Sequence, residues 1–518
     1  MTAKKKLPIG VQSFRKIRQG DYYYVDKTAF VLSLIEEGSY YFLSRPRRFG
    51  KSLLIDTFKE LFSGNRELFA GLYAETRWDW SVAYPVLAFS FAGGVLGSVE
   101  ALQQSLIAQL SQYEQQYRLE VPFAEINIRF KALVREAHAQ TGQRVVVLVD
   151  EYDKPILDRI EDRAEALRLR EVLRDFYSMI KDSDAHVRFA FLIGVSKFSK
   201  AGIFSGLNNL RDITVSPGYS AICGYTEKDL DTVFAPELEG LDRQMLRQWY
   251  DGYHWLGENV YNPFDVLLFF AERTIAPYWF ESGTPTFLIK LLLERGVFTP
   301  ELGRTIASEM LLSTFDVDTM PVEALLFQTG YLTVHRVEEI AGSRFFHLRY
   351  PNREVYQSLS ICMAGAFLED PSRESGLRLD LVRLLKAADF AGLERHFQAL
   401  FAAIPHDWHR RNAIGEYEGY YASVFYSHFA ALGLDIRVED TTSQGRVDMA
   451  VLFEGRVLLF EFKVVEQAPE GKALAQLVAK GYADKYLDRG EPVYLIGVEF
   501  SRRTRSVCGF EVQEVQAG

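Results

Sequence analysis

Cysteine is scarce in this sequence of 518 residues, which contains three, Cys223, Cys362 and Cys508, at wide spacings and without a CxxC pair. Such sparse cysteines exclude a disulfide framework, and we predict reduced thiols and a cytoplasmic location. The sequence also has no run of 18 apolar residues, and its Met-Thr-Ala-Lys-Lys-Lys start has no apolar core. We therefore expect neither a membrane span nor a secretory signal. We find no internal repeat and no low-complexity linker.

Positive charge is not in excess, because 59 Lys and Arg residues stand against 69 Asp and Glu residues, which gives a net charge of −10. This balance excludes a protein coated with nucleic acid over most of its surface, although it leaves room for a local basic groove. Hydrophobic residues make up 48% of the sequence and charged residues 25%, as in ordinary globular proteins. The length suits two to four domains with substantial cores.

The clearest chemical signal is the tripeptide Gly50-Lys51-Ser52. The apolar run Tyr40–Leu43 before it predicts a buried strand, and the residues after it predict an amphipathic helix through Phe62. A strand, a turn and a helix in this order form a phosphate site, because a helix N-terminus presents unpaired N–H groups and a positive dipole end. In such a site Lys51 contacts the outer phosphates and the Ser52 hydroxyl binds Mg²⁺. The sequence therefore predicts an ATP site.

One position departs from the P-loop pattern GxxxxGK[ST], because Arg45 stands where the first glycine is expected. Arginine cannot easily adopt the backbone angles open to glycine, so the loop need not wrap a triphosphate in the usual way. Arg45, Arg47 and Arg48 offer guanidinium groups that match phosphate geometry, and we predict Arg45 and Arg48 as nucleotide-binding residues. For the tripeptide alone, a basic turn that caps a helix is an equally good interpretation.

Two further apolar runs, Val145–Val149 and Phe189–Val195, predict buried parallel strands of the same α/β domain. The first strand ends in Asp150-Glu151 and the second ends at Ser196. Both ends belong to the edge at which open α/β sheets bind ligands. A solvated strand end is the alternative interpretation of Asp150-Glu151 considered alone.

An additional strand, predicted at Tyr84–Phe91, lies between the Gly-Lys-Ser and Asp-Glu elements. With the glutamate beside the aspartate, this order resembles the additional-strand, catalytic-glutamate class of P-loop ATPases, which includes AAA proteins. The resemblance implies that Asp150 holds Mg²⁺ through water, that Glu151 polarises the attacking water, and that Ser196 senses the γ-phosphate.

The middle of the chain, from residue 224 to residue 404, has a mainly helical pattern. Within it a helix predicted at Val322–Gln328 precedes two predicted strands, Tyr331–Val337 and Arg344–Tyr350. A helix followed by a hairpin suggests a winged-helix-like module, and plain packing of a helix on a hairpin is the alternative.

A second group of charged residues lies on a predicted C-terminal hairpin whose turn is Glu454-Gly455. A two-residue turn places Phe453 opposite Arg456 and, in the same register, Asp448 opposite Glu461. Opposed side chains have Cβ atoms about 5 Å apart. Two carboxylates at that distance repel each other unless one is protonated or a cation lies between them.

Lys463 projects from the same face of the hairpin as Glu461, because it follows two residues later. The opposite face is predicted to be apolar, with Val447, Met449, Phe460 and Phe462. A buried charged cluster needs a partner, and a divalent metal with oxygen ligands supplies one. An exposed polar face with salt bridges is the alternative.

Flanking elements complete a unit with the order αβββαβ. Glu418 begins a predicted helix that runs to Leu432, and a second helix, Lys472–Leu487, carries Gln476. Strands are predicted at Leu434–Asp440 and Val493–Val498 on either side of the hairpin. This arrangement resembles the core of the PD-(D/E)XK nuclease superfamily. The resemblance implies that Asp448 and Glu461 hold Mg²⁺, or Mn²⁺, with help from Glu418, that Lys463 orients or deprotonates the attacking water, and that Gln476 steadies the site.

The chain as a whole resembles a bacterial family of uncharacterised proteins that join an AAA-ATPase-like domain to a PD-(D/E)XK nuclease-like domain. In that family arginine is usual where the first P-loop glycine would stand. The matching stretches are Tyr24–Thr28, Arg45–Ser52, Leu148–Asp153, Gly194–Ser199, Gly206–Leu210, Tyr261–Pro263, Gly445–Asp448 and Phe460–Lys463.

We therefore expect an α/β protein with a P-loop domain at 1–223, a helical middle at 224–404 and a nuclease-like domain at 405–518. The leading hypothesis is an ATP-controlled, metal-dependent nuclease that acts on nucleic acid, DNA in preference to RNA, with assembly into a homo-oligomer left open. Residues 405–518 contain 13 Lys and Arg against 17 Asp and Glu. A nucleotide-binding regulatory or assembly protein whose nuclease fold binds without cutting therefore stays as an alternative. A working ATPase with a degenerate nuclease is a third hypothesis, and the intact Asp448, Glu461 and Lys463 disfavour it.

Overall fold

The computed structural model describes residues 4–515 apart from 95, 121–123, 199–201, 282–285, 296, 298, 313–320, 369, 405–417 and 443–444. The chain divides into two compact units, Met1–Gly283 with Thr305–Asn352, and Thr284–Arg304 with Arg353–Gly518. The predicted boundaries at 223/224 and 404/405 do not coincide with this division. Within the described part of the chain, no helix has the length and apolar character that crossing a membrane requires.

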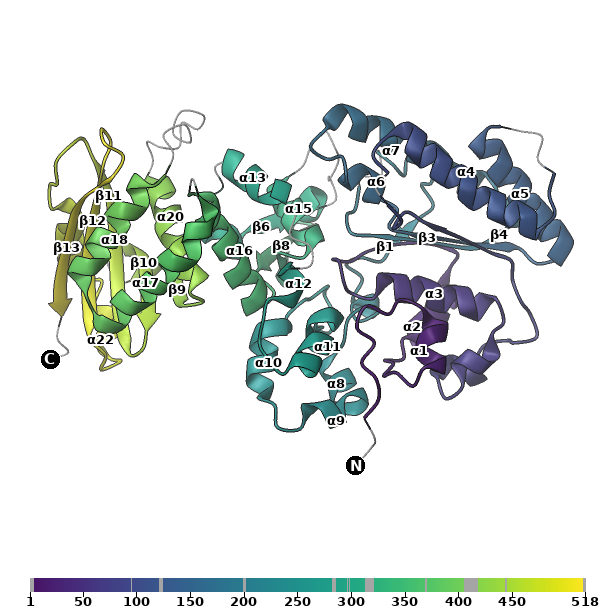
Figure 1. Cartoon of the computed structure of the whole chain (residues 1–518), viewed down its shortest axis with the longest axis horizontal. Helices are drawn as coiled ribbons and strands as arrows, with labels where there is room; N and C mark the ends of the chain where they lie inside the picture. Colours follow the sequence, from purple (N-terminus) through teal and green to yellow (C-terminus); the bar gives the residue numbers. More distant parts are fainter. Residues whose placement is uncertain are drawn as a thin grey trace. The chain divides into compact units, whose positions relative to one another are not determined.

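A five-stranded parallel sheet forms the core of the first unit, with the strand order β2-β3-β4-β1-β5 (Figure 1). The strands are β1 (Tyr40–Ser44), β2 (Val86–Ser90), β3 (Val145–Asp150), β4 (Val187–Gly194) and β5 (Arg211–Asp212). All six residues of β3 are buried, as expected of a central parallel strand rich in valine. The predicted P-loop α/β fold is confirmed. The predicted additional strand, β2, lies at the sheet edge, and it is β4 that separates β1 from β3 in space.

The register of the sheet brings the predicted site residues to one edge. Ser44, at the end of β1, pairs with Gly194, and Asp150, at the end of β3, pairs with Ile193. The P-loop, Asp150 and the residues after β4 therefore lie at the ends of three neighbouring strands, β1, β3 and β4.

Helices cover both faces of this sheet (Figure 1). One face carries α1 (Phe14–Gln19), α2 (Thr28–Glu37) and α3 (Lys51–Phe62), and the other carries α4 (Val99–Gln116), α5 (Ile126–Thr141) and α7 (Arg163–Asp182). The short α6 (Lys154–Leu157) follows β3. Helix α3 begins and ends where the sequence predicts it.

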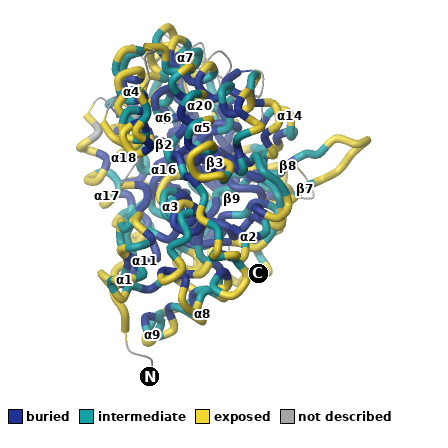
Figure 2. Tube along the Cα trace, turned by 90° about the vertical axis from the view of Figure 1, so that its right-hand side faces the viewer, coloured by how far each residue is buried: buried dark blue, intermediate teal, exposed yellow. Residues whose placement is uncertain are grey.

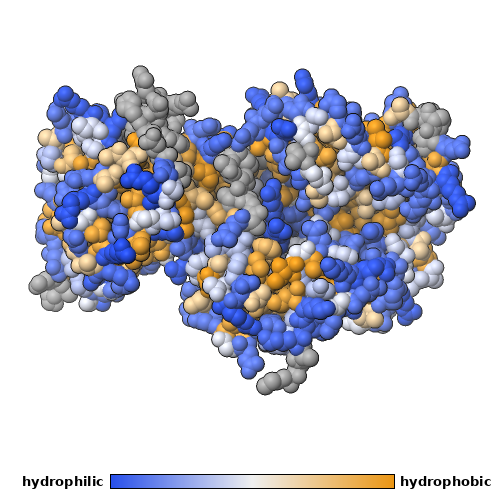
Figure 3. Space-filling view, in the orientation of Figure 1, coloured by the Kyte–Doolittle hydropathy of each residue, from blue (hydrophilic) through white to orange (hydrophobic). Residues whose placement is uncertain are grey.

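A smaller helical part follows the sheet in the first unit. Its helices are α8 (Glu227–Val233), α9 (Ala235–Leu238), α10 (Arg243–Tyr250), α11 (Pro263–Glu272) and α12 (Tyr278–Glu281). Tyr23 and Val25, from the segment before α2, pack in the same apolar cluster as Tyr250 and Phe270. In the space-filling view, apolar surface gathers around α11 (Figure 3).

The rest of the first unit is a small module made of α14 (Glu309–Leu312), α15 (Val322–Thr329) and a three-stranded sheet. The strands β6 (Ile306–Ser308), β7 (Thr333–Ile340) and β8 (Ser343–Arg349) have the order β6-β8-β7. The predicted helix and hairpin are thus present, and β6 adds a third strand. The tip of the β7–β8 hairpin is exposed (Figure 2), whereas six of the eight residues of α15 are buried.

The second unit contains a five-stranded sheet with the order β13-β12-β11-β10-β9. Its strands are β9 (Asp435–Thr442), β10 (Gly445–Phe453), β11 (Arg456–Val465), β12 (Val493–Ser501) and β13 (Val507–Val515), and only the β11–β12 pair is parallel. Its helices are α13 (Thr286–Glu294), α16 (Arg353–Ala366), α17 (Glu374–Ala387), α18 (Phe390–Ala402), α20 (Glu418–Ala431), α21 (Lys472–Ala479) and α22 (Asp484–Leu487).

The predicted order αβββαβ is present, with two differences. The predicted helix Lys472–Leu487 is two helices, because the chain turns at Gly481, whose φ of 55° lies in the left-handed region. The last predicted strand extends to Ser501, and β13 follows it as a fifth strand that the sequence reading did not contain.

Candidate functional sites

The P-loop opens into a cavity of about 450 Å³. Gly50 forms the N-cap of α3 with a φ of 85°, which glycine adopts without strain. Its lining includes the P-loop residues Arg47, Arg48, Gly50, Lys51 and Ser52, the residues Glu151, Asp153 and Val195 near the neighbouring strand ends, the N-terminal residues Pro8, Gly10, Val11 and Gln12, and residues of α11. Residues from the segment before α1 therefore contribute to the lining of this cavity.

Lys51 is buried at the bottom of this cavity, 7% exposed. Its ammonium donates to the carbonyl oxygens of Arg45 and Pro46, at 3.1 and 2.8 Å. Burial lowers the pKa of Lys51, and the negative charges of Asp150 and Asp153 oppose that effect. The Lys51 ammonium is therefore hydrogen-bonded to two carbonyl oxygens of the P-loop, and it lies beside the N-terminus of α3, which would bind phosphate.

Asp150 and Ser52, the two residues predicted to bind Mg²⁺ at the nucleotide site, are brought together. Burial raises the pKa of Asp150, which is 6% exposed, and a hydrogen bond from the Ser52 hydroxyl opposes this rise. Asp150 Oδ1 has no hydrogen-bond partner among the described residues. A buried carboxylate oxygen without a partner is costly, and a hydrated divalent cation at this place would satisfy it.

Glu151 lines the cavity directly after Asp150. Its φ of 52° is rare for a residue with a Cβ atom, and such backbone strain clusters at functional sites. Burial raises the pKa of Glu151, and the neighbouring charge of Asp150 raises it further. The carboxyl group therefore holds a proton more firmly than an exposed glutamate does.

Ser196 does not lie open to the cavity as a γ-phosphate sensor would. It is 1% exposed, its hydroxyl donates to Asp153 Oδ2 at 2.5 Å, and its N–H donates to the same oxygen at 2.6 Å. Asp153 also accepts from the N–H of Val195 at 3.1 Å. The sequence analysis assigned no role to Asp153, although its position three residues after Asp150 could have indicated a site residue.

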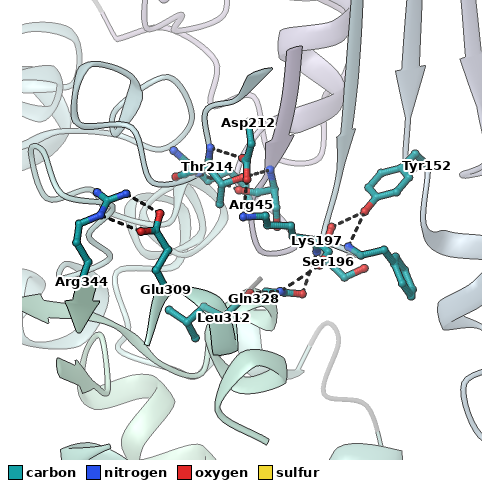
Figure 4. Close-up of polar contacts among 12 residues, drawn as sticks. Arg45, Tyr152, Ser196, Lys197, Asp212, Thr214, Glu309, Leu312, Gln328 and Arg344 are labelled. Atoms are coloured by element: carbon teal, nitrogen blue, oxygen red, sulfur yellow. Dashed lines mark hydrogen bonds and ion pairs between the residues drawn. The ribbon is translucent and has the colours of Figure 1, made fainter. Parts of the chain in front are cut away.

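Arg45, which we predicted to contact phosphate, is not among the residues that line the cavity. Arg45 is fully buried, and its guanidinium donates to the carbonyl oxygens of Ser44, Tyr219 and Thr214, of which Thr214 is labelled in Figure 4. The guanidinium carbon also lies 4.0 Å from the centre of the Trp255 ring. Burial lowers the pKa of Arg45 to about 10. The Arg45 side chain therefore links the end of β1 by hydrogen bonds to residues 214–219, which follow β5.

Arg48 does line the cavity, with a φ of 69° and its guanidinium 4.7 Å from the centre of the Phe264 ring. A second cavity of about 60 Å³ adjoins the first, with shared lining at Pro8, Gly50, Leu53, Tyr225 and Pro263. Its remaining lining is mainly apolar and aromatic.

The C-terminal hairpin has the predicted register. Phe453 pairs with Arg456 and Met449 with Phe460 around the Glu454-Gly455 turn. Phe460 and Phe462 face α20, where the rings of Phe462 and Phe425 lie 5.1 Å apart. Val447 differs from the prediction, because it belongs to the opposite cluster with Leu459 and Leu477.

Glu461 is the centre of the second site and is 1% exposed. Burial raises its pKa to about 7, and the charge of Asp448 contributes to the rise. Asp448 itself accepts the N–H of Phe462 at 2.7 Å. The charge of Asp448 thus acts in the direction that the predicted repulsion requires, and Glu461 Oε2 has no hydrogen-bond partner among the described residues.

Lys463 and Gln476 converge on the other oxygen of Glu461. The Lys463 ammonium donates to Glu461 Oε1 at 3.0 Å and to the Phe462 carbonyl at 3.0 Å. The Gln476 amide donates to the same carboxylate oxygen from α21. The structure therefore brings together Asp448, Glu461, Lys463 and Gln476.

Glu499, which the sequence reading missed, anchors the helix that carries Gln476. Its carboxylate is 3% exposed and accepts four consecutive N–H groups at the start of α21, those of Glu470, Gly471, Lys472 and Ala473, at 2.5 to 3.3 Å. An acidic residue near a helix N-terminus compensates the unpaired N–H groups there. No local pattern reveals such a contact, because Glu499 lies 26 or more positions away in the sequence.

Glu418 begins α20, as predicted, but its side chain lies outside what the structure describes. Among the described residues, no group of three or more His, Cys, Asp and Glu side chains is arranged to hold a metal ion. The carboxylate pair would therefore leave most ligand positions to water or phosphate, which suits Mg²⁺.

Comparison with known proteins assigns both regions to families. Residues 8–204 match the model of a predicted AAA-ATPase domain, and residues 416–510 match a model of the PD-(D/E)XK nuclease superfamily. An uncharacterized protein in the vnfD 5′ region of Azotobacter chroococcum mcd 1 is 59% identical over 514 residues, 99% of this chain and 100% of that protein. The chain belongs to the family that joins these two domains. The whole-chain resemblance inferred from the motifs is confirmed.

Proposed function

We propose that this family member is an ATP-controlled, divalent-metal-dependent nuclease that cleaves phosphodiester bonds of DNA or RNA. The proposal rests mainly on the burial of the Glu461 carboxyl group and on the contacts of its two oxygens. A buried glutamate beside Asp448, with a raised pKa and one oxygen lacking a partner among the described residues, is a group that a cation would stabilise.

The residues of the second unit fit a divalent metal. Asp448 and Glu461 would hold it, and a bound metal would supply an activated water and neutralise charge on the phosphodiester. Lys463 keeps an ammonium beside Glu461, where it would orient water or a phosphate oxygen. Gln476 fixes the Glu461 carboxylate through its amide, and Glu499 fixes the helix that carries Gln476.

The residues of the first unit fit a nucleotide with Mg²⁺. Lys51, Arg48 and the N-terminus of α3 would bind phosphates in the cavity, and Ser52 and Asp150 would hold the metal. Glu151 lies in the same cavity and would position the attacking water. The buried Arg45 replaces a glycine as part of the scaffold, so its presence does not remove the phosphate site.

The alternative is a nucleotide-binding regulatory or assembly protein whose nuclease fold binds nucleic acid or a partner without cutting. The excess of acidic residues in 405–518 and the burial of α15, the helix that a winged helix would use for DNA, favour it. It predicts intact metal binding without strand cleavage.

The test is incubation of the purified full chain with plasmid, single-stranded DNA and RNA, with and without Mg²⁺ or Mn²⁺ and ATP. We expect metal-dependent cleavage of at least one substrate by the wild type and none by Lys463→Ala. Intact nucleic acid in every reaction, with metal binding demonstrated by calorimetry, would replace the nuclease with the alternative.

A further inference from the structure

Gln328 of α15 is a buried amide that bridges two segments of the first unit (Figure 4). Its Oε1 accepts the N–H of Lys197 at 2.9 Å, and its Nε2 donates to the Leu312 carbonyl at 3.1 Å and to the Lys197 carbonyl at 3.4 Å. Gln328 is 4% exposed. Because a buried polar side chain is tolerated when its donors and acceptors are paired, these bonds fix the segment after β4 against α14 and α15.

The segment that Gln328 contacts also contributes to the lining of the nucleotide cavity. Val195 lines the cavity, and Asp153 binds the N–H groups of Val195 and Ser196. A Cβ atom on Gly194 would meet Asp153 Oδ1 at 2.4 Å, so the chain passes this point without spare room. Residues 194–197 are thus held by the nucleotide site on one side and by α15 on the other.

A second set of contacts connects the same segment to the P-loop (Figure 4). The Lys197 ammonium lies 2.6 Å from Asp212 Oδ2, and Asp212 Oδ1 accepts the N–H of Thr214 at 2.8 Å. The Thr214 carbonyl in turn accepts from the buried Arg45 guanidinium at 2.8 Å. Lys197 is therefore the residue at which contacts from the P-loop side and from α15 meet.

We infer that Gln328 is a positioning residue for the nucleotide site and that through it α14 and α15 respond to whether the cavity holds ATP. The inference rests on the proposed function, because it requires a nucleotide in the cavity. Closely packed, fully hydrogen-bonded segments shift between discrete arrangements and do not deform continuously. A nucleotide that displaces Val195 or Ser196 must therefore move Lys197, and Gln328 carries that displacement into α15. The chain leaves the second unit at Arg304, directly before this module, and returns to it at Arg353, directly after the module.

Hydrogen–deuterium exchange of the full chain tests the inference without requiring hydrolysis. Peptides covering 46–58 report the P-loop, and peptides covering 322–332 report α15. ATP–Mg²⁺ should slow exchange in both regions of the wild type. In Gln328→Ala it should slow exchange at the P-loop only. Glu309→Gln, which breaks the Glu309–Arg344 ion pair of the same module, is the matched control and should behave as the wild type does.

Outcomes of this experiment separate the inference from the proposed function. If the P-loop of the wild type shows no protection by ATP–Mg²⁺, the proposed nucleotide site is wrong. If the P-loop is protected and α15 is not, or if α15 remains protected in Gln328→Ala, the role of Gln328 is wrong. Gln328→Asn provides a second variant, because the asparagine side chain is too short to bridge Lys197 and Leu312. The same loss of α15 protection is expected, and the substitution leaves a smaller void in the core than Gln328→Ala does.

The kcat for ATP hydrolysis gives a second test, because it would not change in a folded variant if Gln328 only stabilised the fold. Loss of the Gln328 contact that positions the segment next to the nucleotide site should lower kcat for ATP about tenfold. The affinity for ATP should stay within about threefold, since the phosphate contacts of Lys51 and α3 are intact. A Gln328→Ala variant with wild-type kcat at a temperature where it is fully folded would overturn the inference.

Discussion

Asp448 and Glu461 are neighbours on β10 and β11, and burial of Glu461 together with the charge of Asp448 raises the pKa of Glu461 to about 7. Without a metal ion, the two carboxylates disfavour each other's ionisation, although the Lys463 ammonium partly offsets this for Glu461. A bound divalent metal ion would make the ionised form of both carboxylates favourable. The stability of this region should therefore depend on metal and on pH together.

Asp448→Asn should separate the two effects. The asparagine keeps an oxygen that can accept the N–H of Phe462, and it removes the negative charge beside Glu461. Without metal at pH 8, we expect a melting temperature higher by about 2–4 °C, which corresponds to relief of about 1 kcal/mol. The increase produced by millimolar Mn²⁺ in the wild type should vanish. Calorimetric melting with and without Mn²⁺ measures both changes, and an unchanged Mn²⁺ effect would remove Asp448 from the metal site.

The pH dependence follows from the pKa of Glu461. Because its folded-state pKa of about 7 exceeds its ordinary 4.5, the folded state retains a proton that the unfolded state releases. The stabilisation from that proton is complete below pH 4.5 and is lost as the pH rises through 7, a change of up to roughly 3 kcal/mol. In Glu461→Gln this pH-dependent change in the free energy of unfolding should be absent. Metal-free melting curves recorded from pH 5 to pH 8 measure it. Identical pH profiles for variant and wild type would contradict it.

Metal binding should show the opposite dependence, since the metal competes with the proton on Glu461. Affinity for Mn²⁺ should rise by up to about tenfold per pH unit below pH 7 and level off above it. Titration calorimetry at several pH values measures this. A flat profile would mean that Glu461 does not bind the metal.

The sequence predicts the local parts of these sites well and the long-range contacts poorly. The hairpin register follows from the two-residue turn at Glu454-Gly455, and the P-loop helix follows from Gly50 and the apolar pattern after it. Arg45 was assigned to phosphate because its charge is visible in the sequence, whereas the carbonyl groups that bind it lie up to 174 residues away.

The same limit applies to residues that hold other residues in place. Glu499 and Gln328 have no motif, and their partners, the first N–H groups of α21 and the main chain of Lys197, become neighbours only in the folded unit. Ser196 was correctly placed at a strand end, but its hydroxyl binds Asp153, which no periodicity argument could show.

Lys463→Ala should keep the metal and lose the chemistry. An ammonium is not a ligand of Mg²⁺ or Mn²⁺, so the metal-induced rise in melting temperature should persist, while cleavage should fall at least about 100-fold. Melting with Mn²⁺ and a cleavage assay on the same preparation measure the two properties. If the variant cleaves at the wild-type rate, Lys463 has no chemical role.

The nucleotide site should show a matching division between binding and hydrolysis. Lys51→Ala should abolish binding of ATP–Mg²⁺, because it removes the buried cation of the cavity. Glu151→Gln should bind ATP and fail to hydrolyse it. Calorimetry and phosphate release measure these properties, and equal ATP affinity in Lys51→Ala and the wild type would refute the P-loop assignment.

Arg45→Gly restores the usual P-loop pattern and should nevertheless be harmful. The change leaves the carbonyl groups of Thr214 and Tyr219 without their buried donor and exposes one face of Trp255 to a cavity. We expect a loss of about 3 kcal/mol or more in the free energy of unfolding and no gain in ATP affinity. Chemical denaturation measures the first quantity, and a more stable variant would contradict the structural role of Arg45.

The most direct test of nucleotide control over the nuclease is the rate of nucleic-acid cleavage with and without ATP at a fixed concentration of free Mn²⁺. The wild type should cleave at rates that differ at least about threefold between the two conditions, a change in barrier of roughly 0.6 kcal/mol. Lys51→Ala should cleave at one rate regardless of ATP, and Lys463→Ala should not cleave in either condition. Metal-dependent cleavage by the wild type that is identical with and without ATP would contradict the claim that the two sites work together.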